Sequence, residues 1–225
     1  ALMVDLVAPG ITTAELDEVA DAYIRQQGAV ASALNYRGYP RSICTSINEV
    51  VVHGIPGTRR LANGDIISVD IAVKNAGYHG DMNVSFGVGD IDPETARLLA
   101  TTKEGLEIGL RTSEPAARLG DVGHQIQTHI EAAGFSVVRD YCGHGIGRNF
   151  HEEPQLLHFG PSGTGRRLQP GVVFTIEPMV NAGVADVRVL EDEWTAVTAD
   201  GMRSAQFEHT IAVTESGPDV LSRFH

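Results

Sequence analysis

Apolar residues recur at intervals of three and four along three stretches of the chain, a spacing typical of helices that bury one face. Before the first stretch, Thr12 is followed three residues later by Glu15, which predicts a capping box at the helix N-terminus. Before the second, Asp92 provides an N-cap and Pro93 takes the first helical position. The predicted helices cover about residues 12–28, 92–113 and 119–134.

Between these helices lie short runs of β-branched and aromatic residues, which favour strands. The runs cover residues 50–52, 66–73, 84–88, 172–176 and 207–213. Helices and strands in one chain of this length predict an α+β fold with a sizeable core.

A weak internal repeat relates the two halves of the chain. At an offset of 106 residues, the helix that ends at Gly28 falls on the helix that ends at Gly134. At an offset of 107, the strand that ends in Asp70 falls on the strand that ends in Glu177. We therefore expect one domain of two pseudo-symmetric halves, with acidic residues meeting where their sheets join. The domain would span residues 1–225, and its halves about 1–110 and 111–225.

Composition places the chain among ordinary globular proteins, with 42% hydrophobic and 20% charged residues. Its 17 basic and 29 acidic residues leave a net charge of −12, which argues against electrostatic binding of nucleic acid. No stretch approaches the roughly 18 apolar residues of a membrane span, and two unclustered cysteines are typical of reducing compartments. We therefore expect a cytoplasmic protein without a membrane or direct nucleic-acid partner.

Two aspartates flank a predicted hairpin whose turn centres on Asn75 and Ala76. Pairing about that centre sets Asp70 opposite Asp81, with Cβ atoms about 5 Å apart, where two bare carboxylates repel each other. A pair of divalent metals about 3.5–4 Å apart would explain the arrangement, because opposed carboxylates can chelate and bridge them. The alternative is a different register, in which one aspartate is simply solvated.

Three further residues carry metal-ligand chemistry. His144 lies between Gly143 and Gly145, which allow close backbone packing and let the imidazole enter a crowded site. Glu177 ends an apolar run and Glu208 lies among strand formers, although each taken singly favours a structural role. With the two aspartates they make four carboxylates and one imidazole, which suit Mn, Fe(II), Co or Zn and balance the charge of two divalent ions.

Two other chemistries are excluded by spacing. The glycines around His144 do not match a phosphate-binding Gly-x-Gly-x-x-Gly loop, and no Lys-Ser or Lys-Thr follows them. The run that starts at His151 superficially suggests a zinc-protease helix. However, Gln155 stands where a second histidine is required, and Pro154 would break the helix.

Seven motifs occur in order along nearly the whole chain. They lie at residues 38–55, 69–71, 79–81, 143–147, 150–154, 175–180 and 206–210. Together they resemble the type I methionine aminopeptidases. The resemblance implies the pita-bread fold, in which two pseudo-symmetric halves contribute antiparallel sheets covered by helices. It also implies hydrolytic removal of the initiator methionine from nascent proteins and peptides, with a preference for a small second residue.

The resemblance further implies a centre of two divalent ions. Their ligands would be Asp70, Asp81, His144, Glu177 and Glu208. Asp81 and Glu208 would bridge the ions, and a metal-bridging hydroxide would attack the carbonyl after the methionine, with Glu177 assisting proton transfer. Coordination lowers the pKa of water toward neutrality, so this nucleophile would exist at cytoplasmic pH.

The resemblance also assigns the contacts with substrate. His53 and His151 match two histidines that are not ligands, contact the substrate backbone and stabilise the tetrahedral intermediate. An aromatic and sulfur-bearing pocket would hold the methionine side chain, because a thioether packs well at ring edges. The pocket residues would be Tyr36, Tyr39, Cys44, Phe150 and Trp194. The expected partners are N-terminal Met peptides and nascent chains, and the family tendency is a monomer.

Two alternatives stay open. A proline-specific peptidase of the same fold would share all five ligands, although the motifs around Glu177 and Glu208 match the methionine enzymes better. A non-catalytic binding protein on this scaffold would typically lose ligands, whereas this chain keeps all five. The chain opens at what resembles the end of the family's first helix, so we expect that helix to be shortened.

Overall fold

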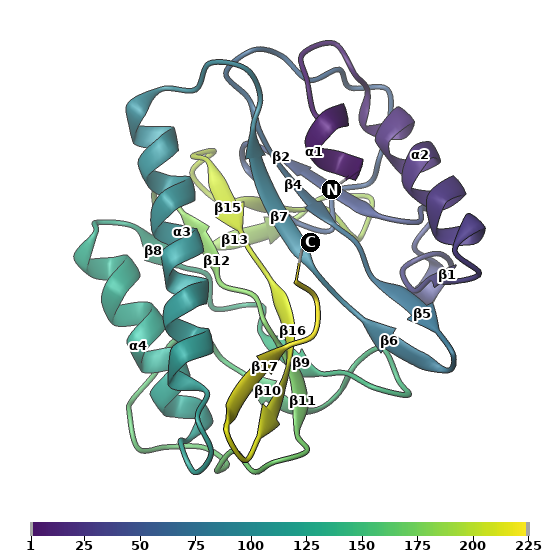
Figure 1. Ribbon diagram of the computed structural model, residues 1–225. Coiled ribbons are helices and arrows are strands. Elements are labelled where there is room, and N and C mark those ends of the chain that lie inside the picture. The colour runs from purple at the N-terminus through teal and green to yellow at the C-terminus, as the bar shows by residue number, and fades with distance from the viewer. Residues whose placement is uncertain (1, 224–225) are drawn as a thin grey trace.

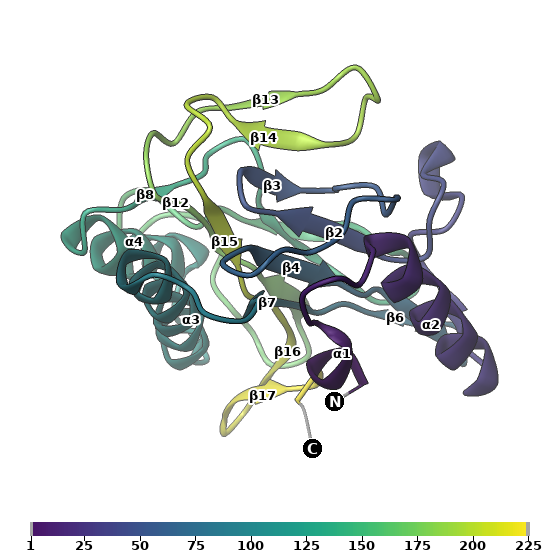
Figure 2. The same cartoon turned by 90° about the horizontal axis from the view of Figure 1, so that it is seen from above.

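In the computed structural model, which describes residues 2–223, helices flank the strands on two opposite sides (Figures 1 and 2). On one side lie α1 (Leu2–Leu6) and α2 (Thr13–Gln26), and on the other α3 (Pro93–Thr112) and α4 (Leu119–Ala132). A 3-10 helix, η1, covers Tyr36–Gly38. The three predicted helices are confirmed to within two residues at each end.

The predicted caps of α2 and α3 are present. Thr12 Oγ1 accepts the backbone N–H of Glu15 at 3.2 Å, and the Glu15 carboxylate accepts the backbone N–H of Thr12 at 2.7 Å. At α3, Asp92 Oδ1 accepts the N–H of Thr95 at 2.9 Å. These side chains satisfy N–H groups that a helix terminus leaves unpaired, so both helices begin where the sequence predicts.

Short strands fill the space between the helices. The earlier strands are β1 (Val30–Ala31), β2 (Cys44–Ile47), β3 (Val50–Val52), β4 (Ile66–Asp70), β5 (Val73–Asn75), β6 (Tyr78–Gly80) and β7 (Asn83–Gly87). The later strands are β8 (Ser136–Val137), β9 (Gly143–Gly145), β10 (Glu152–Leu156), β11 (Val173–Ile176), β12 (Met179–Asn181), β13 (Val187–Val189), β14 (Ala196–Thr198), β15 (Ser204–Gln206), β16 (His209–Thr214) and β17 (Gly217–Val220). Strand pairings within the described residues are antiparallel, as expected.

Two predicted strands differ from the structure by more than one residue, and both of these differences fall at ligand candidates. The run at 66–73 is divided into β4, which ends at Asp70, and β5. The run at 207–213 starts two residues late as β16, so Glu208 lies in the gap between β15 and β16. In both places the chain leaves one sheet and enters another, since β4 pairs with β2 and β7 while β5 pairs with β1 and β6. The side-chain pattern continues across such a transition and does not reveal it.

The predicted register of the aspartate hairpin is wrong. The turn is Ala76-Gly77, one residue later than predicted, and φ is 49° and 86° at these two positions. Positive φ at both positions is what a two-residue turn of this kind requires, and Gly77 supplies it readily. Asp70 consequently pairs with Asn83 across β4 and β7, and not with Asp81. The two aspartates still meet in one cavity, as described below.

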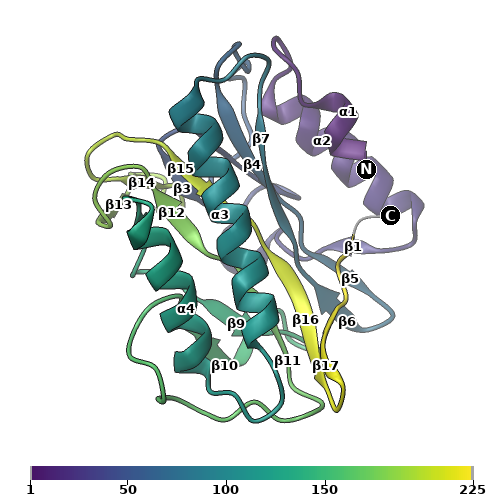
Figure 3. The ribbon, with the colours of Figure 1, turned by 60° about the vertical axis from the view of Figure 1, so that its left-hand side comes forward.

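The main core lies between the α3–α4 pair and the later strands, where the two helices run side by side (Figure 3). Ile126 and Ile130 of α4 are fully buried there. Gly109 of α3 approaches so closely that a Cβ would lie 2.9 Å from both Ile126 Cδ1 and Ile176 Cγ2. Because Ile176 ends β11, this contact holds α3 against the strand that carries Glu177.

A second core lies between α2 and the β2–β4–β7 sheet, with Leu16, Ile43 and Ile67 fully buried. The helical part of the internal repeat is visible, because α2 and α4 each have 14 residues and begin at Thr13 and Leu119. The division of the chain into two halves of one domain stays a prediction. Within residues 2–223, no helix combines the length and apolar character needed to cross a bilayer.

Candidate metal centre and substrate cavity

The predicted metal ligands come from five separate places in the chain and face one cavity of about 650 Å³. Asp70 ends β4, Asp81 follows β6, His144 lies in the middle of β9, and Glu177 follows β11. Glu208 comes from the gap between β15 and β16. The four carboxylates therefore reach the cavity from the ends of strands or the gaps between them, and His144 reaches it from within a strand.

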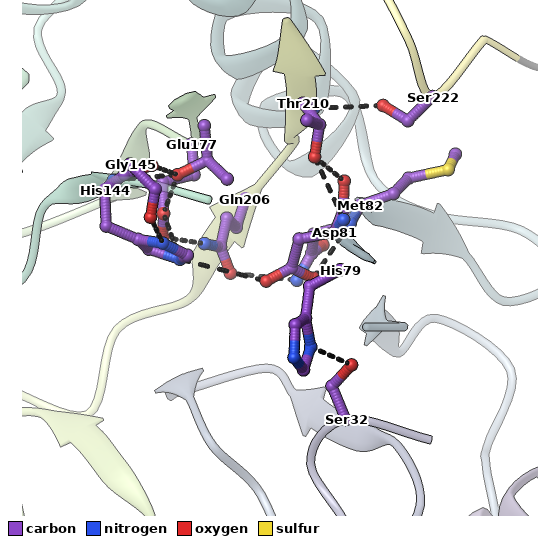
Figure 4. Close-up of polar contacts among 12 residues, drawn as sticks. Ser32, His79, Asp81, Met82, His144, Gly145, Glu177, Gln206, Thr210 and Ser222 are labelled. Atoms are coloured by element: carbon purple, nitrogen blue, oxygen red, sulfur yellow. Dashed lines mark hydrogen bonds and ion pairs between the residues drawn. The ribbon is translucent and has the colours of Figure 1, made fainter. Parts of the chain in front are cut away.

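Three of these residues form a compact cluster. Asp81, His144 and Glu208 each offer one ligand atom, and the three atoms lie within 4.8 Å of one another. His144 Nε2 is 3.9 Å from Asp81 Oδ2 and 3.8 Å from Glu177 Oε1, so the imidazole lies between these two carboxylates (Figure 4). Asp70 joins the cluster electrostatically, because its pKa is raised by burial and further by the charges of Asp81 and Glu177.

Burial of four carboxylates together disfavours their charged forms. The pKa of Glu177 is raised to about 8, mainly by burial and further by the charge of Asp81, although a hydrogen bond from Thr175 opposes the shift. Burial also raises the pKa values of Asp70, Asp81 and Glu208. Repulsion among these groups would be removed by a bound cation, which stabilises every ionised carboxylate at once.

The donor set fits a divalent metal in two further respects. Glu208 Oε1 is buried and has no hydrogen-bond partner among residues 2–223, so this oxygen is free to act as a ligand. His144 Nδ1 lies 2.9 Å from the carbonyl oxygen of Gly145, which can only accept, so Nδ1 carries the proton. The lone pair is then on Nε2, which faces the carboxylates and is the atom that a metal would bind.

Surrounding residues hold Glu177 in place. Thr175 Oγ1 donates to Glu177 Oε1 at 2.7 Å, and Gln206 Nε2 donates to Glu177 Oε2 at 3.3 Å. The backbone N–H of Glu177 donates to His158 Nε2 at 3.0 Å. Sequence reasoning did not single out Thr175 and Gln206, although both lie two residues from a ligand within a recognised motif. It missed His158 altogether, because no pattern distinguishes a buried histidine that serves a distant backbone group.

The predicted substrate residues line the same cavity. They are Tyr36, Tyr39, Cys44, His53, Phe150, His151 and Trp194. The structure thus brings together all 12 candidate residues, and their individual roles stay predictions. The cavity is also lined by Arg37, Tyr141, Cys142 and Met179, which were not among the predicted site residues.

Aromatic contacts organise the side of the cavity next to the metal cluster. The ring of His151 lies with its centroid 4.1 Å from that of His144, 4.3 Å from Phe150 and 5.2 Å from Tyr36. Although His151 is exposed, its pKa is lowered by partial shielding from water and by neighbouring positive charge. The imidazole is therefore neutral near pH 7 and keeps an N–H that can donate.

His53 reaches the cavity from a left-handed backbone conformation, with φ at 60° directly after β3. A non-glycine residue with positive φ is uncommon and is often found at functional sites. Its ring packs against Tyr141 at 5.5 Å and Trp194 at 6.2 Å between centroids. Burial among these rings lowers the pKa of His53 to about 4, so this imidazole is also neutral.

Comparison with known proteins agrees with this geometry. The model of metallopeptidase family M24 matches residues 1–215. Methionine aminopeptidase 1 of Bacillus subtilis is 52% identical over 217 residues, which cover 96% of this chain and 88% of that protein. The crystal structure of methionine aminopeptidase from Rickettsia prowazekii superposes with a TM-score of 0.97 at 44% identity, covering 99% of this chain and 90% of that one.

Proline-specific relatives share the fold at a greater distance. Xaa-Pro dipeptidase from Bacillus anthracis has a TM-score of 0.78 at 21% identity, and the match covers 99% of this chain but 56% of that one. This likeness concerns the fold alone. By sequence and by its pita-bread architecture, the chain belongs to metallopeptidase family M24, beside the bacterial methionine aminopeptidases.

Proposed function

We propose that this chain is a divalent-metal-dependent methionyl aminopeptidase, which hydrolyses the bond after an N-terminal methionine in peptides and nascent chains. The observation that carries the proposal is the buried cluster of carboxylates and one imidazole, with a free oxygen on Glu208, at the base of an aromatic cavity. The identity of about 50% with bacterial methionine aminopeptidases over most of their length supports the same activity.

The metal would be held by all five predicted ligands. We propose two ions, since four carboxylates balance their charge, with Asp81 and Glu208 as the shared ligands. Carboxylate and imidazole donors suit Co, Mn, Fe(II) or Zn. When bound, such cations would supply Lewis acidity, which makes water nucleophilic near neutral pH.

The side chain of the methionine would lie against Tyr39, Cys44 and Trp194. The Tyr39 ring is 2% exposed and packs edge-on to Trp194, with centroids 5.1 Å apart. Its hydroxyl donates to the carbonyl oxygens of Ile43 and Gly54, so the polar end of the ring is occupied away from the substrate. The remaining wall is apolar and aromatic, which favours a thioether over a charged side chain.

Two neutral histidines would bind the substrate backbone. Because the pKa values of His53 and His151 are both lowered, each ring keeps one N–H donor without adding positive charge beside the metal. An N–H donor aimed at the carbonyl oxygen gains strength as negative charge develops there in the transition state. We assign this role to His151, which lies against His144, and substrate orientation to His53.

Glu177 would carry the proton. Its carboxylate is held by Thr175 at one oxygen and by Gln206 at the other, so it has a fixed position from which to accept a proton from the nucleophile. It would then deliver that proton to the departing amine. The rings of Tyr36 and Phe150 restrict the space beside His151, and we propose that they limit the second residue to a small side chain.

A peptide assay tests the proposal. The purified protein, stripped with EDTA and reloaded with Mn²⁺ or Co²⁺, should release methionine from Met-Ala-Ser, and the stripped protein should not. Met-Lys-Ser is the control for the second position, and Ala-Pro-Ser is the control for a proline-specific enzyme. Cleavage of Ala-Pro-Ser alone would replace the proposal with the proline-specific activity. Tight metal binding without cleavage of any peptide would favour a binding protein.

A further inference from the structure

His158 is a buried histidine outside the cavity, with no role in the mechanism above. It follows β10 and is fully shielded from solvent. Its Nε2 lies 3.0 Å from the backbone nitrogen of Glu177 and accepts that N–H. Because Nε2 accepts, the ring proton must be on Nδ1, which is buried without a hydrogen-bond partner among the described residues. The side chain is therefore placed for one interaction, the one with Glu177.

The N–H of Glu177 needs this acceptor. Strand β11 ends at Ile176, one residue before Glu177, and Pro178 follows. Glu177 lines the cavity, but its backbone N–H donates to His158, which does not line it. A backbone N–H that is shielded from water and loses its acceptor is costly, which favours a backbone shift that recovers a partner. A shift at Glu177 moves the carboxylate that is a predicted ligand and proton carrier.

The segment that carries His158 is fixed independently of the cavity. It lies against Gly123 of α4, where a Cβ would come within 2.2 Å of the Leu157 oxygen and 3.0 Å of the Phe159 nitrogen. One turn along α4, Gln127 Oε1 accepts the N–H of Gly160 at 2.9 Å. Helix α4 thus holds the backbone on both sides of His158, and this fixes the position from which the ring accepts the Glu177 N–H.

We propose that His158 is a positioning residue, which acts through the backbone of Glu177 to set the geometry of the metal centre and hence both metal affinity and turnover. This inference rests on the proposed metal-dependent function. It adds a specific contribution of α4, which supplies no residue to the cavity. Removal of a group that hydrogen-bonds to a metal ligand and orients it typically lowers metal affinity or activity by 10–100-fold.

Two substitutions with amide side chains distinguish loss of the hydrogen bond to Glu177 from loss of the imidazole ring. In His158→Gln, the side-chain oxygen can reach the position of Nε2 and accept the Glu177 N–H. In His158→Asn, the side chain is too short and leaves this N–H unpaired. We expect Mn²⁺ affinity, measured by calorimetry, to fall about tenfold or more in the Asn variant. The Gln variant should stay within about threefold of the wild type, and kcat should follow the same order with a smaller effect on KM.

The matched control is His129→Asn, because His129 on α4 also has a buried ring nitrogen without a partner among residues 2–223, whereas the Glu177 N–H donates to His158. Its Mn²⁺ affinity should be that of the wild type. Equal losses in His158→Gln and His158→Asn, or wild-type affinity in His158→Asn, would overturn the proposal. Mn²⁺ affinity is measured without a peptide, so the comparison of the His158 variants does not depend on peptidase activity. If the wild type binds Mn²⁺ but cleaves no peptide, the proposed activity is refuted and the affinity comparison still decides the role of His158.

A measurement on the wild type does not depend on whether the variants fold. The ¹⁵N spectrum of the histidine rings distinguishes a protonated from an unprotonated ring nitrogen. The proposal requires His158 to carry its proton on Nδ1, with coupling across the hydrogen bond between Nε2 and the Glu177 amide. A His158 ring protonated at Nε2 would contradict it, since that nitrogen could no longer accept.

Discussion

At the scale of single residues, His53 combines two unfavourable features at the cavity. Its backbone is in the left-handed region, and its ring is shielded between Tyr141 and Trp194. Shielding lowers the pKa of His53 to about 4, whereas an unfolded histidine titrates near 6.5. Such features persist where the surrounding structure imposes them, and they leave a measurable signature in the pH dependence of stability.

The signature has a definite sign. Because the folded pKa is lowered, the unfolded chain binds the proton first as pH falls, so the contribution of His53 to stability is present above about pH 6.5 and is lost toward pH 4. Replacing His53 with Gln should therefore make the free energy of unfolding fall less steeply between pH 7 and pH 4.5. The difference should be up to about 3 kcal/mol, measured by urea unfolding in EDTA.

Other buried histidines are common to the wild type and this variant, so their effects cancel in the comparison. Conversion of Tyr141 to Phe is a suitable control, because it alters a neighbour of His53 and leaves the imidazole in place. Parallel pH profiles for the wild type and His53→Gln would show that the His53 ring takes up its proton equally well in the folded state.

At the scale of elements, α2 supports the proposed methionine pocket without lining it. Asp17 is 5% exposed, and its Oδ1 accepts the backbone N–H groups of Ser42 and Ile43 at 2.9 and 3.0 Å. The carbonyl oxygen of Ile43 in turn accepts from the Tyr39 hydroxyl at 3.0 Å. The segment that leads into β2 and Cys44 is therefore held to the helix by the buried Asp17 carboxylate, and Asp21 Oδ1 also accepts from the Ser42 hydroxyl at 2.7 Å.

Removal of the Asp17 carboxylate should loosen the pocket and spare the metal centre. We expect Asp17→Ala to lower the free energy of unfolding by about 2–3 kcal/mol, because two buried N–H groups lose a charged acceptor. KM for Met-Ala-Ser should rise roughly tenfold, equivalent to about 1.4 kcal/mol, with a smaller change in kcat. Steady-state kinetics and urea unfolding measure both effects.

Glu18→Ala is the matched control, since Glu18 is the next residue of α2 and is exposed. It should change neither KM nor stability appreciably. If Asp17→Ala lost stability but kept the wild-type KM, the link from α2 to the pocket would be refuted, and Asp17 would only stabilise the fold.

At the scale of the whole molecule, the candidate metal centre joins two parts of the chain. Asp70 and Asp81 come from the earlier strands, and the other three predicted ligands come from the later ones. Polar contacts hold the two parts together: Asn83 Nδ2 donates to Gln206 Oε1 at 2.9 Å, and the Asp81 backbone N–H donates to Thr210 Oγ1 at 2.9 Å. The centre therefore depends on the correct docking of both parts, and a bound metal should stabilise that docking.

This linkage predicts a large thermal response to metal. At a Mn²⁺ concentration about 100 times its Kd, the native state should gain about 2.7 kcal/mol. For a chain of 225 residues this corresponds to a rise in Tm of about 5–10 °C over the protein in EDTA. Differential scanning calorimetry with and without Mn²⁺ measures the shift.

Two variants separate ligation from catalysis in the same experiment. Asp81→Ala should lose the shift in Tm and the bound metal, since it removes a carboxylate from the cluster. His151→Ala should keep both and lose peptidase rate. A full shift in Asp81→Ala would place the metal elsewhere, and loss of metal in His151→Ala would make that residue a ligand.

Much of this protein could be predicted from local sequence. The helices begin where Thr12 and Asp92 cap them, because a cap acts on N–H groups only two or three residues away. The candidate ligands could be named because acidic residues in strand-forming runs are costly without a charged partner. Motif order was enough to predict the family, which the comparisons confirm.

Two errors concern which residues pair across strands and where a strand ends, and both involve other segments of the chain. The hairpin register was wrong because Gly77 accommodates positive φ, which moves the turn by one residue and pairs Asp70 with Asn83. The gap at Glu208 was missed because the apolar pattern continues while the strand changes sheets. At Glu208 the neighbouring residues do not contain the information, whereas at the hairpin Gly77 itself is the local signal for the later turn.

The sequence by itself determined the helices, the chemistry of the candidate ligands and the family, since these depend on residue types at short spacings and on the order of motifs along the chain. Only the tertiary structure decided how the ligands meet, which groups orient Glu177, and that α2 and α4 support the site from outside the cavity. The physical reason is the distance along the sequence over which each interaction acts. Caps and periodicity act over a few residues, whereas the contact of Asp81 with Thr210 spans 129 positions and exists only once both parts have folded and docked.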